Sequence, residues 1–307
     1  MRLTLLLAVL AIGCFARSSP DAETPVKKDA PETKDAAKKE GDKKDEKKNG
    51  EKKDGEKTPV KGFAAVEDIN TEITALQVLY TLNCDAEQLE ALGKLAASTM
   101  QEAPPRKEVK VTDKYRRALV ALREALGRGD DEEVDKRFAA LDELREAEEP
   151  AFDPVELTEA ARKEAPGLFR RFNARQIATY LKGVDDFPDP VEKVLAALEE
   201  SRKRRGAPWR DLRDGVAFEA GWLLAGADAK GAADTKQKVI DLLDKAAKME
   251  DKEYDAQKPA LAKEAKDLLG KQGPSDIIRN YMEYVLAETL SNHRLKAALE
   301  RLEKGRK

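Results

Sequence analysis

Apolar residues recur at intervals of three and four positions along most of the chain after residue 62, and this spacing constrains the fold more than any other feature. Ile69, Ile73 and Leu76 form one such series, and Leu119 and Leu122 belong to another. Side chains at this spacing lie on one face of an α-helix. No persuasive strand pattern and no hairpin dipeptide between apolar segments is present. The sequence therefore predicts an all-α fold, an irregular multi-helix bundle or helical array of about ten helices.

Several boundaries of these helices carry capping signals. Asp85 precedes Gln88 by three positions, and Asn173 precedes Gln176 by the same interval. Both pairs match the capping box, in which the two side chains bond each other's backbone N–H groups at a helix start. Residues 127–130, Gly-Arg-Gly-Asp, are typical of a helix stop followed at once by a helix start.

The most hydrophobic predicted helix runs from about Pro208 toward Ala225. Ala217, Gly221 and Ala225 follow one another at steps of four, so they form a face of small side chains that a neighbouring helix can approach closely. We predict that this is the central buried helix. Glu219 lies within it, and we expect this carboxylate either to face solvent or to pair with Arg213 or Arg210.

A repeated helix pair would indicate a solenoid. Residues 193–198 resemble residues 238–243, about forty-five positions later. A single match does not establish a period, so an α-solenoid stays as the alternative to a bundle.

The amino terminus has the features of an export signal. Met1 and Arg2 are followed by a largely apolar run, residues 3–12, and then by Gly13 and Cys14. A positive start, a short apolar run and small residues near a cleavage point are typical of a secretory signal peptide. The run is too short to span the roughly 30 Å core of a bilayer. We therefore predict a signal peptide over residues 1–16.

Residues 10–14, Leu-Ala-Ile-Gly-Cys, resemble the bacterial lipoprotein box, although Ala11 stands where that pattern prefers leucine. The resemblance implies cleavage before Cys14 and lipidation of its thiol, which would tether the protein to a membrane. Ordinary signal cleavage after Ala16 is the alternative, and it would remove Cys14. Either process leaves Cys84 as a lone thiol, which we interpret as a small half-buried residue before a helix.

Residues 17–62 are rich in alternating Lys, Asp and Glu and contain no apolar period. Such a composition cannot bury enough surface to offset chain entropy, so we predict a disordered linker. A flexible coil of this length reaches roughly 35 to 40 Å. Residues 63–307 then form the predicted all-helical domain. The acidic residues nearly cancel the lysines of the linker, so a nucleic-acid-binding arm is not expected.

The inventory of reactive side chains argues against most catalytic sites. His293 is the only histidine of the chain, so histidine-based metal sites and Cys-His pairs have too few members. We interpret His293 as a first-turn residue of a last helix that Ser291 begins. We therefore predict no catalytic residues, no metal site and no cofactor.

Two charge clusters are candidate binding sites. Arg202, Lys203, Arg204 and Arg205 are candidates for contact with an anion or a lipid head group, although cations at a helix end also complement its dipole. Residues 185–189, Asp-Asp-Phe-Pro-Asp, are a weak candidate for calcium, since they lack the spacing and the closing glutamate of an EF-hand. Helix capping explains Asp189 equally well.

The net charge is -3, with 38 % charged, 41 % hydrophobic and 5 % aromatic residues, so neither polyanion binding nor an acidic-substrate field is implied. We expect a non-enzymatic helical binding or scaffold protein, exported to the bacterial cell envelope as a periplasmic or membrane-anchored lipoprotein, with secretion as the alternative. Its expected partner is a protein, and the membrane would be contacted through a lipid on Cys14. A helical envelope hydrolase that uses a carboxylate such as Glu219 is the alternative function.

Overall fold

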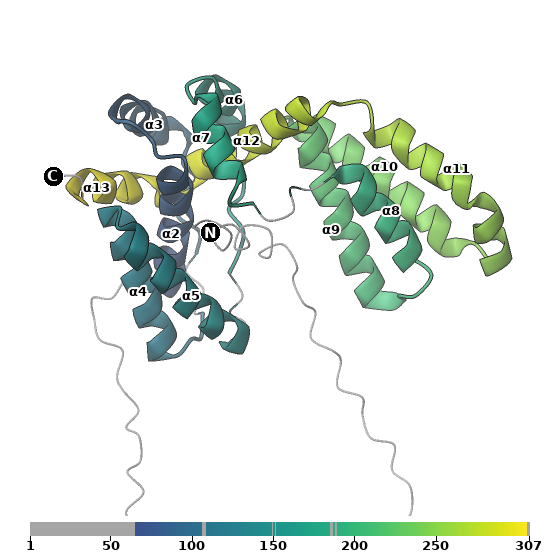
Figure 1. Ribbon diagram of the computed structural model, residues 1–307, viewed down its shortest axis with the longest axis horizontal. Coiled ribbons are helices and arrows are strands. Elements are labelled where there is room, and N and C mark those ends of the chain that lie inside the picture. Colours follow the sequence, from purple (N-terminus) through teal and green to yellow (C-terminus); the bar gives the residue numbers. More distant parts are fainter. Residues whose placement is uncertain are drawn as a thin grey trace, which may run out of the picture. The chain divides into compact units, whose positions relative to one another are not determined.

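The computed structural model describes residues 65–105, 109–148, 150, 152–184, 187 and 189–305, and helices but no strands occur among them (Figure 1). Twelve helices are described: α2 (Val66–Thr81), α3 (Ala86–Thr99), α4 (Asp113–Arg128), α5 (Asp131–Glu148), α6 (Glu159–Phe169), α7 (Ala174–Leu181), α8 (Pro190–Glu200), α9 (Gly206–Ala225), α10 (Ala229–Lys248), α11 (Asp251–Leu269), α12 (Pro274–Ser291) and α13 (Leu295–Gly305). The predicted all-helical class is confirmed for this part of the chain. The predicted signal peptide and linker lie outside the described residues.

Both predicted capping boxes are present, and they contact each other. Gln88 N donates to Asp85 Oδ1 at 2.9 Å, and Gln176 N donates to Asn173 Oδ1 at 3.0 Å. The Gln88 Nε2 group donates to Gln176 Oε1 at 3.1 Å, and Gln176 Nε2 donates back to Gln88 Oε1 at 2.8 Å. The starts of α3 and α7, 88 positions apart, are therefore joined through the same two carboxamides that cap them.

Two other predicted helix boundaries are confirmed, and one is wrong. Gly129 ends α4 in the left-handed region at a φ of 68°, as the Gly-Arg-Gly-Asp segment predicted. Asp189 caps α8, accepting a hydrogen bond from Val191 N at 2.8 Å. Ser291, however, does not begin the last helix. It is the last residue of α12, and its hydroxyl donates to the Ala287 carbonyl oxygen one turn earlier at 2.8 Å.

No helix was predicted over the residues that form α6. Its buried residues are Ala161, Ala165 and Leu168, and it contains Pro166. Alanine is a weak signal of apolar periodicity, and a proline within a helix removes one backbone hydrogen bond. The short side chains nevertheless allow α6 to pack along α12.

Buried apolar side chains form two clusters. The first is built mainly by α2 to α7, α12 and α13, with Leu76, Leu122 and Leu290 fully buried in it. The second belongs to α8 to α11, which Figure 1 shows grouped together, and contains Val194, Leu243 and other residues. The described residues nevertheless all belong to one compact unit.

Helix α9 takes part in both clusters. Ala217 and Ala220 belong to the second cluster, whereas Leu223 belongs to the first. Helix α10 packs closely against the small-residue face of α9. A Cβ placed on Gly221 would lie only 2.7 Å from the Ala232 carbonyl oxygen. The prediction of a close helix approach at this face is therefore confirmed.

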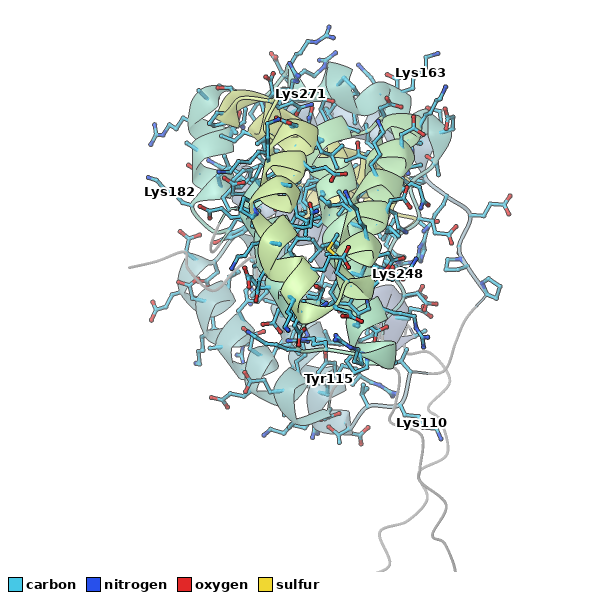
Figure 2. The ribbon with its side chains drawn as sticks, turned by 90° about the vertical axis from the view of Figure 1, so that its right-hand side faces the viewer. Lys110, Tyr115, Lys163, Lys182, Lys248 and Lys271 are labelled. Carbon is cyan, nitrogen blue, oxygen red and sulfur yellow. The ribbon has the colours of Figure 1, made fainter. Side chains whose placement is uncertain are left out.

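Most charged side chains lie on the outward sides of the helices, and Glu72 is an exception. Figure 2 shows the side chains of Lys163 on α6 and Lys182, directly after α7, extending outward. Tyr115, in contrast, is fully buried in the first cluster. This division follows the helical periodicity of the sequence.

Candidate functional site

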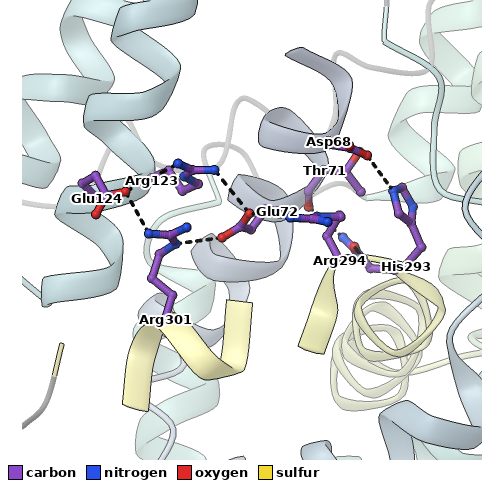
Figure 3. A network of polar contacts seen from close by, with 9 residues as sticks. Asp68, Thr71, Glu72, Arg123, Glu124, His293, Arg294 and Arg301 are labelled. Carbon is purple, nitrogen blue, oxygen red and sulfur yellow. Dashed lines mark hydrogen bonds and ion pairs between the residues drawn. The ribbon is translucent and has the colours of Figure 1, made fainter. Parts of the chain in front are cut away.

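A buried glutamate on α2 is surrounded by arginines from α4, α13 and the turn before α13 (Figure 3). The side chain of Glu72 is 1 % exposed. Arg301 Nε donates to Glu72 Oε1 at 2.7 Å, and Arg301 Nη1 donates to Glu124 Oε1 at 2.8 Å. On the other carboxylate oxygen, Arg294 Nη2 donates to Glu72 Oε2 at 3.2 Å. Arg123 Nη1 lies 3.5 Å from that oxygen.

In this network both carboxylate oxygens of Glu72 have guanidinium partners. A buried carboxylate is tolerated only when charge partners and hydrogen bonds replace its lost hydration. Because guanidinium groups contact both oxygens, neither oxygen faces open space for a substrate. We interpret the carboxylate as the point that joins α2 to α4 and α13.

A second set of contacts continues along α2. His293 Nε2 lies 3.4 Å from Asp68 Oδ1, and Asn292 Nδ2 donates to the Thr71 carbonyl oxygen at 2.9 Å (Figure 3). His293 is thus in the turn between α12 and α13, not in the first turn of a helix as predicted. The reason is that Asn292 ends α12 and accepts a hydrogen bond from Arg294 N at 2.8 Å, which delays the start of α13.

A hollow of about 350 Å³ adjoins the Glu72 network. The residues that line it are Glu72, Glu124, Gly127, Arg128, Arg294, Ala297, Glu300, Arg301, Lys304 and Gly305. They come from α2, α4, α13 and the turn before α13, and most of them are charged. The hollow therefore suits a small polar ligand better than an apolar one.

Aromatic side chains form a second candidate site. Although the whole chain has only 8 Phe, 2 Trp and 6 Tyr, ring contacts link six of them into what we call the aromatic cluster: Tyr180, Phe187, Phe218, Trp222, Tyr281 and Tyr284. Trp222 stacks on Tyr284 with ring centroids 4.8 Å apart, and Phe218 meets the edge of Tyr284 at 6.4 Å.

The aromatic cluster runs from the interior to the surface. Tyr180 is fully buried, and burial raises its pKa well above the ordinary range. Tyr281 is 7 % exposed, and burial raises its pKa to about 12. Phe218 is 37 % exposed, and within the described ranges it is the one large hydrophobic side chain that is exposed. Aromatic rings that are both supported and exposed are common at binding surfaces.

Glu288 lies one helical turn beyond Tyr284 on the same face of α12. The side chain is half-buried, and burial of its carboxyl group raises the pKa to about 7. Among the residues that the structure describes, no hydrogen bond or ion pair of this carboxyl is found. A desolvated acid beside aromatic rings is a candidate for ligand contact.

Arg202, the first of the four basic residues singled out by the sequence, contacts the end of α10. Its Nη1 donates to the Met249 carbonyl oxygen at 2.8 Å and to the Ala246 carbonyl oxygen at 3.3 Å. Its guanidinium also pairs with Asp251 and lies 5.2 Å from the centre of the Tyr254 ring. These contacts give Arg202 a structural role, since cations commonly satisfy the last carbonyls of a helix.

The three basic residues that follow Arg202 also have partners within the chain. Lys203 Nζ and Arg204 Nε donate to the Glu200 carboxylate at 2.9 and 3.0 Å. Arg205 Nη1 donates to the Ser201 carbonyl oxygen at 2.5 Å. Contact of this segment with an anion or a lipid head group stays a prediction.

Glu219 pairs with Lys193, whose Nζ lies 2.5 Å from Oε1, and not with Arg213 or Arg210. The predicted pairing was wrong because Arg213 contacts Asp244 of α10 at 2.8 Å. Sequence spacing within α9 could not anticipate partners on other helices.

The remaining candidate residues of the sequence are Cys84, Cys14 and the candidate calcium segment. Cys84 is 1 % exposed, more buried than predicted, and directly precedes the capping residue of α3. Cys14, the predicted lipidation site, and residues 185, 186 and 188 of the candidate calcium segment lie outside the described residues.

Three further properties bear on function: metal-binding clusters, membrane-spanning helices and similarity to known proteins. In the described ranges, no group of three or more His, Cys, Asp or Glu residues is placed to hold a metal ion. None of the helices there combines the length and apolar content that crossing a bilayer requires. Comparisons with protein-family models, curated proteins and solved structures found no match.

Sequence reasoning missed both candidate sites. The pattern placed Glu72 among the residues of an apolar helix, but it carried no indication of its arginine partners. Phe218 and Trp222 are four positions apart, as are Tyr284 and Glu288, so each helix face was readable. The contact between these two faces was not.

Proposed function

We propose that this chain is an exported, membrane-tethered binding or scaffold protein of the bacterial cell envelope, and that it binds a protein partner through the aromatic cluster. The observation that carries the binding proposal is the exposure of Phe218 beside the stacked pair Trp222 and Tyr284. Aromatic side chains often dominate the energetics of protein interfaces.

The helices that present these rings are held to each other. Asn280 Nδ2 of α12 donates to the carbonyl oxygens of Leu223 and Leu224, at the end of α9, at 3.1 and 2.8 Å. Rings on a preformed support lose little conformational freedom on binding. This arrangement favours binding by a rigid surface over folding around a partner.

An acid near the rings suggests the chemistry of the partner segment. Glu288 lies one turn after Tyr284 on α12, whereas Glu219, next to Phe218, is already paired with Lys193. Cations bind favourably over aromatic faces and pair with carboxylates. A partner segment with Lys or Arg among apolar residues would match this surface.

Support for export and tethering comes from the sequence alone, from the apolar run that ends at Cys14 and the charged residues 17–62. Mass spectrometry of the mature protein from its native host tests this part. A diacyl or triacyl mass on Cys14 is expected. A mature start at Arg17 would contradict the tether, and an intact Met1 would contradict export.

The binding surface is tested by co-purification from the native host with three forms of the full chain. We expect proteins that co-purify with the wild type to be depleted by Phe218→Ala and retained by Lys263→Ala, an exposed control on α11. Circular dichroism should show that both variants remain folded. Equal recovery with wild type and Phe218→Ala would contradict the aromatic cluster as the binding surface.

The hydrolase alternative depends on Glu219, and its ion pair with Lys193 does not favour it. A partner that is still recovered with Glu219→Gln would support binding over hydrolysis. Turnover of an envelope substrate that Glu219→Gln abolishes without unfolding the chain would support the hydrolase.

A further inference from the structure

The hollow beside Glu72 has an excess of positive charge. Glu72, Glu124 and Glu300 are the acids among the lining residues, whereas four cationic residues line the hollow: Arg128, Arg294, Arg301 and Lys304. Arg123, which does not line the hollow, adds a fifth positive charge to the network through its contact with Glu72. These five cations exceed the three carboxylates by two charges.

Much of this positive charge is shielded from water. The side chains of Arg123, Arg294 and Arg301 are 15, 31 and 27 % exposed. Unbalanced charge at partly buried positions is unfavourable, because lost hydration is not fully replaced. An anion in the hollow would supply the missing countercharge.

Two guanidinium nitrogens of the Glu72 network lack hydrogen-bond partners in the described part of the chain, one on Arg294, which lines the hollow, and one on Arg123, which does not. Both atoms, Arg294 Nε and Arg123 Nε, are buried. Arg128 and Lys304 are exposed at the rim, and no ion pair of either is found among the described residues. Guanidinium groups are well suited to oxyanions, since they present parallel N–H donors.

Part of the positive charge around the hollow is explained by the ends of α4 and α13. Arg128 and Lys304 lie in the last turns of these helices, where cations complement the helix dipole. This effect accounts for the two rim residues. It does not account for the third guanidinium on Glu72 or for the unpartnered Nε groups.

We propose that this hollow binds an oxyanion of the phosphate class, either free or as part of a lipid head group. Its volume of about 350 Å³ is at the lower end of the roughly 300 to 1,000 Å³ of small-molecule pockets. Arg294 and Arg301 contact the anion while they keep hold of Glu72, and Arg128 with Lys304 binds it from the rim. This site is separate from the aromatic cluster and does not depend on the proposed protein partner.

Titration calorimetry on the full chain with inorganic phosphate tests the proposal, with ionic strength held constant by sodium chloride. The test variant is Arg128→Gln with Lys304→Gln, which leaves the Glu72 network intact. The matched control is Arg117→Gln with Lys296→Gln, which removes the same charge from exposed positions of the same two helices outside the hollow. We expect saturable binding that weakens at least tenfold in the test variant and changes less than twofold in the control.

Two results would overturn the proposal: no saturable heat with phosphate, or equal weakening in the test variant and the control. A second arm distinguishes the sources of the phosphate group. It measures sedimentation of the full chain carrying Cys14→Ser with phosphatidylglycerol vesicles and with phosphatidylcholine vesicles. Loss of phosphatidylglycerol binding in the test variant alone identifies a head group, and phosphate binding without vesicle binding identifies a free anion.

Discussion

Glu72 on α2 and Glu288 on α12 have carboxylates in very different surroundings. Glu72 is surrounded by guanidinium groups that replace its hydration. Glu288 lies beside Tyr281 and Tyr180, and burial raises the pKa of its carboxyl group to about 7. The same residue type therefore joins helices at one position and reduces stability at the other.

Replacing Glu288 with glutamine should stabilise the protein at neutral pH and above. The pKa is about 7 in the folded chain and near its ordinary value of 4.5 in the unfolded chain. Below pH 4.5 both states are protonated and the pH-dependent contribution is zero. As pH rises to about 7 only the unfolded state ionises, so wild-type stability falls. We expect Glu288→Gln to gain about 1 to 3 kcal/mol above pH 7, allowing for partial exposure.

Urea unfolding at pH 4, 6 and 8 measures this difference. Glu90→Gln is the control, because Lys94 Nζ lies 2.6 Å away and lowers the pKa of that exposed carboxyl group. Glu90→Gln should have the opposite effect. Above the pKa of the unfolded state, the variant should be less stable than the wild type, because it lacks the ion pair with Lys94. A Glu288→Gln gain that is the same at pH 4 and pH 8 would contradict the explanation by burial.

At the scale of helices, the packing of α9 on α10 depends on the missing side chain of Gly221. A Cβ there would lie 2.7 Å from a backbone oxygen of Ala232, which cannot move away as a flexible side chain can. We expect Gly221→Ala to cost about 1 to 3 kcal/mol through strain.

Gly167→Ala on α6 is the control for this prediction. A Cβ at Gly167 meets nothing within 4 Å, so the better helix propensity of alanine should stabilise the protein by about 0.5 to 1 kcal/mol. Thermal unfolding of both variants tests the pair. Equal effects of the two substitutions would show that helix propensity, and not close packing, determines the result at Gly221.

Sequence patterns predicted the helices better than the contacts between them. The boxes at Asp85 and Asn173 were readable because each is complete within four residues. Helix α6 was missed because its buried face is mostly alanine, and Ser291 was misplaced because its hydroxyl bonds within α12.

The candidate sites could not be predicted because they form between distant segments. Arg301 is 229 positions from Glu72, and nothing near either residue indicates the other. The aromatic cluster likewise joins rings of α7, α9 and α12 with Phe187. A single sequence shows which face of each helix is apolar, but it does not show which of these faces pack against each other.

At the scale of the whole described unit, α9 connects the two buried clusters. Trp209 belongs to the second cluster, and Trp222 packs against the first. The clusters cannot separate unless α9 breaks or its hydrogen bonds with Asn280 are lost. We therefore expect one cooperative unfolding transition for the helical part of the chain.

The two tryptophans allow a direct test. Trp222→Phe leaves Trp209 as the fluorescence reporter, and Trp209→Phe leaves Trp222. Urea unfolding midpoints from fluorescence should coincide with those from circular dichroism within each variant. A Trp209 transition that precedes the loss of helix signal would show that α8 to α11 unfold separately.

The long separation between Glu72 and Arg301 also affects when the fold can form. During synthesis, α2 emerges long before α13. The Glu72 carboxylate can therefore contact Arg301 only when the chain is almost complete. Contacts this distant in sequence form slowly. For a chain exported as we propose, this late contact would leave the first cluster incomplete until the final helix has passed through the translocation channel.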